Sequence, residues 1–320
     1  MNIALVYNPK DNKLQPQSYS QVYRSQFLSL LKIAQIQITE DTDMDSVSAD
    51  VVIFYDVHSN HHINLKNIKN HKSIKYEYFN DPHQVEVKGH YPDGTYVHKL
   101  NAQQRSERAV ERGVDYIICP FTEPYYKYLS FHLGGRVNLV WFPPAPSLNL
   151  FPNREVRLID REICVLANGA TAETKLTTGY AFRKWVHQQS FAKLAPHSEI
   201  SKTKGVTPCG EKYGQYLGLH AGALALTDDH IVPKYSEIPL AGCVCFASEH
   251  QDYKNMGFKD GVNCIFVDKN NIERKIKDFV SHPQDYQQVA DNGRKLIEDK
   301  WTSDHFARFI LKHAEERYAR

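Results

Sequence analysis

Apolar residues in this chain follow two alternating patterns. The first is a short unbroken apolar run bounded by polar turns, as in residues 51–55 (VVIFY). Such a run is typical of a strand that is buried on both faces of a parallel sheet. On this basis we expect strands at residues 2–7, 51–55, 74–79, 115–119, 137–142, 162–167, 221–226, 243–246 and 263–267.

The second pattern places apolar residues three and four positions apart, as Val22, Phe27, Leu28 and Leu31 are. This spacing predicts helices with one apolar face. We expect helices at residues 19–33, 100–112, 123–132, 180–191, 213–220, 234–241, 272–281, 283–300 and 303–318. Because strands and helices alternate along the chain, the fold class is α/β, with parallel sheets covered by helices on both faces.

Four prolines in residues 142–152 interrupt this alternation, and the pattern restarts beyond them. The chain has 320 residues, more than a single domain usually contains. We therefore predict two doubly wound (Rossmann-like) domains at 1–148 and 149–303. Open α/β sheets bind ligands at the carboxyl ends of their strands, so we expect the two domains to face each other across a cleft, with the proline segment as a hinge.

Composition and charge exclude only a few classes of protein. Hydrophobic residues make up 42% of the chain, charged residues 24%, and the net charge is +2, which does not indicate binding to nucleic acid or to an anionic membrane. Lys66, Lys69, Lys72 and Lys75 form a modest basic stretch, interpreted as a solvated face. The six cysteines form no C-x-x-C pair, which predicts buried thiols in a cytoplasmic protein. No apolar stretch is long enough to predict a membrane span.

One short stretch, KYSEIPLAG at residues 234–242, is unusual for a purely structural helix. The preceding Pro233 can open a helix, and Pro239 predicts that this helix is short or bent. Lys234 and Glu237 then lie three residues apart on one face. They form either a surface ion pair or part of a site that holds a polar ligand.

Further motifs follow in a fixed order. They are Ala241-Gly242, GFKDGVN at residues 257–263, NCIFV at 263–267, VADNGR at 289–294, Trp301-Thr302 and Arg308. In this order, residues 210–312 resemble the C-terminal half of GT-B glycosyltransferases of the group 1 and CgeB-like kind. The N-terminal half is similar to that family in architecture alone. The resemblance implies that the last helix, residues 304–320, crosses back onto the first domain.

The resemblance also implies a site for a nucleotide-diphospho-sugar donor, with UDP or GDP as the nucleotide. In the family, the basic residue of the KYSE-like motif approaches the diphosphate and the glutamate binds the ribose, which are the roles implied for Lys234 and Glu237. Tyr235 and Ser236 lie between them in the same motif. A carboxylate can accept hydrogen bonds from two ribose hydroxyls, and an ammonium group favours a diphosphate.

Two residues of the preceding segment extend this site. Gly169 follows the strand at 162–167, where a glycine lets backbone amides approach a phosphate, although a glycine after a strand is most often just a turn. Arg183 ends a Y-x-x-R sequence that resembles one in CgeB-like relatives. Its guanidinium either binds the diphosphate or covers the surface of its helix.

Candidates for the chemistry at the sugar come from both halves of the chain. Asp229 lies eight residues before Glu237, which forms a D-x7-E pattern in place of the E-x7-E of retaining members, so the stereochemistry stays open. An Asp-rich turn is the alternative reading of this segment. Asp81 and His83 follow the strand at 74–79 and are the best candidates near the reacting centre, with His58 next. The alternative for these residues is an Asx-Pro turn and surface histidines.

We expect no metal and no cofactor. His58, His61 and His62 fit no standard zinc spacing, and the two D-x-D triplets in residues 41–45 are interpreted as a solvated acidic loop. The sequence thus favours a metal-independent glycosyltransferase whose acceptor is a carbohydrate or another hydroxyl. Nucleic acid is expected only as a modified-base acceptor. The alternatives are a non-catalytic relative that binds the nucleotide-sugar and a sugar-nucleotide epimerase.

Overall fold

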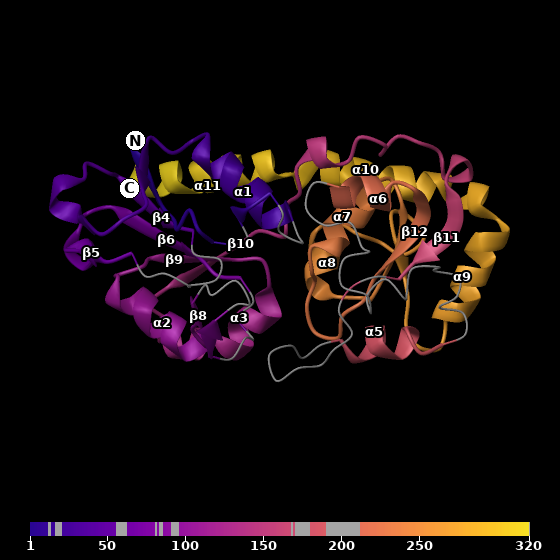
Figure 1. Cartoon of the computed structure of the whole chain (residues 1–320), viewed down its shortest axis with the longest axis horizontal. Coiled ribbons are helices and arrows are strands. Elements are labelled where there is room, and N and C mark those ends of the chain that lie inside the picture. Colours follow the sequence, from indigo (N-terminus) through magenta and orange to yellow (C-terminus); the bar gives the residue numbers. More distant parts are fainter. Residues whose placement is uncertain are drawn as a thin grey trace. The chain divides into compact units, whose positions relative to one another are not determined.

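The structure is a computed structural model. It describes residues 1–11, 14–16, 21–55, 63–80, 82, 86–90, 96–167, 169, 180–189 and 212–319. Contacts divide the chain into two compact units, both of the α/β class (Figure 1). Unit 1 comprises Met1–Gln15, Tyr23–Pro143 and Ser303–Arg320, and unit 2 comprises Pro16–Val22 and Pro144–Thr302.

Unit 1 is built on a six-stranded, fully parallel sheet with the strand order β10-β9-β6-β4-β1-β2. The strands are β1 Ile3–Val6, β2 Ile36–Ile38, β4 Val51–Phe54, β6 Ile74–Tyr78, β9 Tyr116–Cys119 and β10 Asn138–Trp141. All residues of β1 and β4 are buried, in agreement with their unbroken apolar runs. Five of these strands match predicted ones, whereas β2 was not predicted, because its sequence IQI lacks such a run.

Helices of unit 1 come from the beginning, the middle and the end of the chain. They are α1 Gln21–Leu31, α2 Ala102–Glu111, α3 Thr122–Tyr128, α4 Ser130–Leu133 and α11 Ser303–Tyr318. The last helix, α11, packs on β6, where the Tyr76 hydroxyl lies 2.8 Å from Nδ1 of His313. It also joins α1, because the Ser29 hydroxyl donates to the Asp304 carboxylate at 3.0 Å. Helix α11 therefore belongs to the core of unit 1.

Two predictions about polar segments of unit 1 hold only in part, since Asp41, Asp45, Lys66, Lys69 and Lys72 are exposed as predicted. The acidic segment 41–45 is not a simple loop, since it contains β3 Thr42–Asp43, paired with β5 Leu65–Lys66, and the 3-10 turn Met44–Ser46. The basic stretch is not a wholly solvated face, because Lys75 is buried and its Nζ donates to the carbonyls of His71 and Ser73. These carbonyls replace the water that an exposed ammonium group would bind.

Smaller elements complete unit 1. They are the antiparallel pair β7 Val87–His90 and β8 Tyr96–Lys99, and the 3-10 turn Ile68–Asn70. The single helix expected at 123–132 is two helices, α3 and α4, which meet at Leu129.

Unit 2 has a four-stranded parallel sheet in the order β11-β12-β13-β14. Its strands are β11 Glu162–Leu166, β12 His220–Ala225, β13 Val244–Ala247 and β14 Ile265–Phe266. Its helices are α5 Ala181–Val186, α6 Lys212–Leu217, α7 Lys234–Leu240, α8 Gln251–Asn255, α9 Ile272–Ser281 and α10 Gln287–Lys300. The core packs Phe246 of β13 against Phe279 of α9, with ring centroids 5.3 Å apart.

Several boundaries in unit 2 differ from expectation. The helix expected at 213–220 ends at Leu217, and His220 begins β12 instead. The helix expected at 283–300 starts with the 3-10 turn Pro283–Tyr286 before α10. Two more 3-10 turns, Leu148–Leu150 and Leu158–Asp160, precede β11.

The thiols behave as predicted wherever the structure describes them. Cys119, Cys164, Cys243, Cys245 and Cys264 are free and buried, while Cys209 lies outside the described residues. Among the described helices, none combines the length and the apolar character needed to cross a bilayer.

Candidate functional site

Helix α7 carries the KYSE motif and packs against β12, β13 and α10. It begins at Lys234 after Pro233 and contains Pro239, which cannot donate a backbone hydrogen bond. The chain leaves the helix through Gly242 at φ 74°, a conformation that favours glycine. The predicted short helix is thus confirmed.

Lys234 and Arg183 converge on Gly169, the residue just beyond the end of β11. A Cβ atom added to Gly169 would lie 2.5 Å from Nζ of Lys234 and 3.1 Å from Nη1 of Arg183. Gly169 also has φ 108°, which side chains of L-residues rarely allow. The glycine therefore leaves room for two cationic groups beside its backbone.

Arg183 is held rigidly in this position. Its Nε and Nη2 both donate to the carbonyl of Leu226, at 3.1 and 2.7 Å, so that Nη1 is the nitrogen directed toward Gly169. The guanidinium also stacks on Tyr180, 4.3 Å from the ring centroid. The side chain is 6% exposed, so it does not merely cover the surface of its helix.

The two cations destabilise each other in this arrangement. Burial and the neighbouring Arg183 guanidinium hold the pKa of Lys234 well below its usual range, against the opposing effect of Glu237. Burial also lowers the pKa of Arg183. An anion placed between the two groups would relieve both effects, because it would replace the lost hydration and cancel the repulsion.

Glu237 lies one turn beyond Lys234 on α7 and is 4% exposed. A surface ion pair at this spacing is therefore excluded by the burial of the carboxyl group. Burial raises the pKa of Glu237 to about 7, and Lys234 only partly offsets this rise. A carboxyl group with this pKa gains a proton or a hydrogen-bond donor readily, and the hydroxyl groups of a ligand can supply such donors.

The segment 227–230, between β12 and α7, supports the site through hydrogen bonds. The Asp228 carboxylate accepts from the backbone amides of Ala181 and Phe182, at 2.8 and 3.1 Å, and so caps the helix that carries Arg183. Nδ1 of the buried His230 donates to the Asp229 carboxylate at 2.5 Å. Sequence reasoning selected Asp229 but missed Asp228 and His230, because their partners could not be read from the sequence.

Tyr235 and Ser236 are both fully buried and engaged within unit 2. The Tyr235 hydroxyl lies 3.0 Å from Oγ1 of Thr227, and the Ser236 hydroxyl donates to the carbonyl of Pro144 at 2.6 Å. In this structure the two side chains anchor α7. They fix the direction in which Lys234 and Glu237 project.

The sequence also predicts candidates in unit 1. Asp81, His83 and the runner-up His58 lie outside the described residues. Their neighbour Asn80 is buried, and its carbonyl accepts from Nη1 of Arg105 at 2.5 Å. Their assignment to the reaction stays a prediction.

Known structures match this architecture over nearly the whole chain. Sucrose-phosphate synthase from Thermosynechococcus elongatus has a TM-score of 0.57 at 12% identity, covering 100% of this chain and 99% of that one. A glycosyltransferase from Rickettsia africae gives 0.56 at 8% identity, covering 98% of each chain. Anabaena HepE in complex with UDP gives 0.52 at 10% identity, covering 99% of this chain and 100% of the other. The fold is GT-B.

The GT-B assignment confirms the predicted fold class, with its two Rossmann-like units. Residues 159–312, which are 154 of the 320, also match the family model described as glycosyl transferase-like. This segment includes Gly169, Arg183 and the whole of α7. No curated protein sequence matches the chain.

Proposed function

We propose that this protein is a glycosyltransferase that takes its sugar from a nucleotide-diphospho-sugar. The observation that carries the proposal is the convergence of Lys234 and Arg183 on Gly169, which forms a cationic site of the kind a diphosphate needs. The glycosyl transferase-like match over 159–312 and the GT-B fold support it. UDP is our choice of nucleotide because the structurally similar HepE has been crystallised with UDP.

The two cations have a chemical role in this reaction. Transfer breaks the bond between the anomeric carbon and the diphosphate oxygen, and negative charge accumulates on the leaving diphosphate as the acceptor hydroxyl attacks. Lys234 and the pre-positioned Nη1 of Arg183 would stabilise that charge in a partly buried site, where electrostatic interactions are stronger than in water. The proposal includes no metal ion, since these two groups supply the positive charge.

Glu237 would bind the ribose. Its carboxylate can accept from two vicinal hydroxyls, and these donors would replace the water that burial removes from the group. Lys234 and Glu237 then contact adjacent parts of one nucleotide, which accounts for the presence of both in one turn of α7.

We also propose a class of acceptor and the residues that act near the reacting centre. Asp81 and His83 in unit 1 remain our candidates for the groups near the reacting centre, with Asp229 as a further acid in unit 2. The acceptor is proposed to be a hydroxyl of a carbohydrate, and hexosyl transfer is the proposed reaction. A CgeB-like subfamily and a cytoplasmic location likewise remain proposals.

The test is a comparison of nucleotides followed by site variants. Thermal stability of the purified protein is measured against UDP-, GDP-, dTDP-, ADP- and CMP-sugars, and we expect UDP-sugars to stabilise it by about 2.7 kcal/mol at 100 times the Kd. Lys234→Ala and Glu237→Ala should each weaken UDP binding about tenfold or more, because each removes a direct contact.

A matched control is available on α9, where Lys277 and Glu273 form an exposed ion pair at 2.7 Å. Lys277→Ala and Glu273→Ala should leave UDP affinity unchanged and cost only about 0.5 kcal/mol of stability. If no nucleotide-sugar stabilises the protein, the proposal fails. Binding without transfer to any acceptor would favour the non-catalytic alternative, and conversion of the donor without an acceptor would favour an epimerase.

A further inference from the structure

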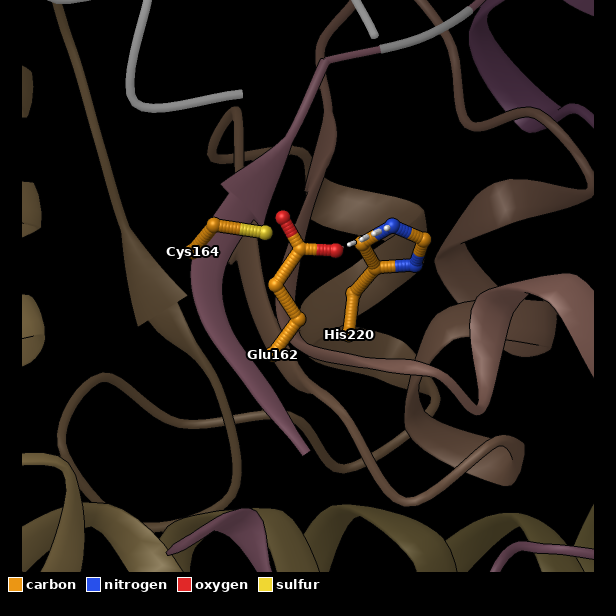
Figure 2. A group of neighbouring side chains, drawn as sticks. All are labelled: Glu162, Cys164 and His220. Atoms are coloured by element: carbon orange, nitrogen blue, oxygen red, sulfur yellow. Dashed lines mark ion pairs between the residues drawn. The ribbon is translucent and has the colours of Figure 1, made fainter. Parts of the chain in front are cut away.

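Three side chains with metal-binding atoms meet at the amino ends of β11 and β12. Glu162 is the first residue of β11, Cys164 follows two positions later, and His220 is the first residue of β12. One ligand atom from each lies within 4.8 Å of the others. Figure 2 shows the Cys164 sulfur and the His220 ring on either side of the Glu162 carboxylate.

Strand pairing brings these residues together. Glu162 pairs directly with His220, and the next pair is Val165 with Gly222. Between these two pairs β11 advances by three residues and β12 by only two, so the register is irregular there. Such an irregularity changes the direction of side chains on the bulged strand. The cluster is therefore a consequence of the sheet and does not depend on a loop.

The hydrogen bond of His220 determines what its other nitrogen can do. Nδ1 lies 3.0 Å from the carbonyl of Tyr216, which can only accept, so Nδ1 carries a proton. In the neutral ring, Nε2 then presents a lone pair toward Oε2 of Glu162, 3.5 Å away. A cation between these two acceptors, either a proton or a metal ion, would stabilise this arrangement. A carbonyl that fixes the tautomer in this way is the usual support of a metal-binding histidine.

Cys164 favours a metal ion over a proton between Glu162 and His220. Its side chain is 5% exposed, its sulfur is directed toward the carboxylate, and it makes no hydrogen bond to any residue in the described part of the chain. A proton shared by Glu162 and His220 leaves this third ligand unused, whereas a metal ion binds all three. A cysteine binds a metal ion as the thiolate, so metal binding would release the thiol proton.

The neighbouring groups are compatible with a metal ion. Cys243 is engaged elsewhere, because its thiol donates to carbonyls at 3.2 and 3.3 Å and its sulfur accepts from Arg161. The positive charge of Arg161 is outweighed by a thiolate and a carboxylate at the site. Glu162 is half exposed, with 51% of its side chain accessible, which gives an ion a route from solvent and leaves a coordination position for water.

We propose that Glu162, Cys164 and His220 form a zinc-binding site that ties β11 to β12. One sulfur, one imidazole nitrogen and one carboxylate oxygen suit Zn²⁺ and exclude a site selective for Mg²⁺ or Ca²⁺. The site lies at the edge of the sheet opposite Gly169 and Arg183, since those residues follow or contact the carboxyl ends of the same strands. Its role is to stabilise unit 2, not to take part in sugar transfer.

The experiment is a titration of the whole purified protein with Co²⁺, which replaces Zn²⁺ and reports its ligands by absorption. We expect a sulfur-to-cobalt charge-transfer band in the near ultraviolet, bleached by an equivalent of Zn²⁺. Cys164→Ser should abolish the band. Cys119→Ser, which alters a buried thiol in unit 1, should leave it unchanged.

Glu162→Gln provides an independent test, because the side chain is half exposed and its replacement should not affect folding. We expect Co²⁺ affinity to fall about tenfold or more, while stabilisation by UDP stays unchanged. The proposal is overturned if the native protein shows no charge-transfer band, if the band survives in Cys164→Ser, or if Glu162→Gln binds Co²⁺ as tightly as the native chain. The first of these results is the one expected for a proton alone between Glu162 and His220.

Discussion

Burial of the Glu237 carboxyl group makes the stability of the protein depend on pH. Its pKa is about 7 in the folded chain and 4.5 for the ordinary group, so folding favours the protonated form. The associated stability is fully present below pH 4.5 and is lost as pH rises through 7. Glu237→Gln should remove this loss, because a neutral amide has no charge to desolvate.

We therefore expect the variant to gain stability relative to the native protein between pH 4.5 and 8, by up to about 3 kcal/mol. Chemical unfolding at several pH values measures the difference. Glu273→Gln, at an exposed position on α9, is the control and should show no such trend. A difference between Glu237→Gln and the native protein that is independent of pH would contradict the shifted pKa.

At the scale of single residues, the sequence predicted the identity of the cationic groups but not their surroundings. Lys234 and Arg183 were selected from motifs that resemble those of a family, and the structure brings both to Gly169. Asp228 was missed because the amides it accepts from lie 46 and 47 residues away in the chain. Contacts at that separation depend on the tertiary fold and leave no local signal.

At the scale of elements, a strand could be predicted from the sequence where both of its faces are buried. Strand β4 is buried throughout and was predicted from its unbroken apolar run. Strand β2 lies at the edge of its sheet and alternates in exposure, and β3 and β5 contain two residues each, so none of them produces such a run. The cluster of Glu162, Cys164 and His220 was missed for a related reason, since only the pairing of β11 with β12 brings it together.

Helix α5 gives a prediction at this scale, because Asp228 caps the helix on which Arg183 lies. Asp228→Ala should lower the free energy of unfolding by about 1 kcal/mol and also weaken UDP binding, since the first turn of α5 would lose both acceptors. Asp228→Asn keeps one acceptor oxygen and should restore much of both quantities. Denaturant unfolding and UDP titration of the two variants provide the measurements. Lost stability with unchanged UDP affinity would limit Asp228 to a structural role.

At the scale of the whole molecule, the chain returns to unit 1 after completing unit 2. Both ends of the chain contact one residue of unit 1, Asp50: the Met1 amino group lies 3.9 Å from its carboxylate, and Tyr318 is hydrogen-bonded to it. Phe306 of α11 is fully buried, and its ring packs against those of Phe142 and Tyr78, with centroids 5.4 and 6.2 Å away. The last helix thus completes the core of unit 1, while the proposed donor site lies in unit 2.

Because of this division, we predict that a variant can lose stability in unit 1 and still bind the nucleotide in unit 2. Phe306→Ala should cost about 3 kcal/mol or more, because it leaves a cavity among aromatic rings that cannot close around it. The loss should fall on unit 1, so denaturant unfolding should split into two transitions, with UDP raising only the second. Phe309→Ala on the same helix is the control, since that ring is 38% exposed and its loss should cost far less. If Phe306→Ala instead unfolds in a single transition at lower denaturant concentration and also binds UDP more weakly, the two units fold as one. Helix α11 would then couple the stability of unit 1 to the donor site.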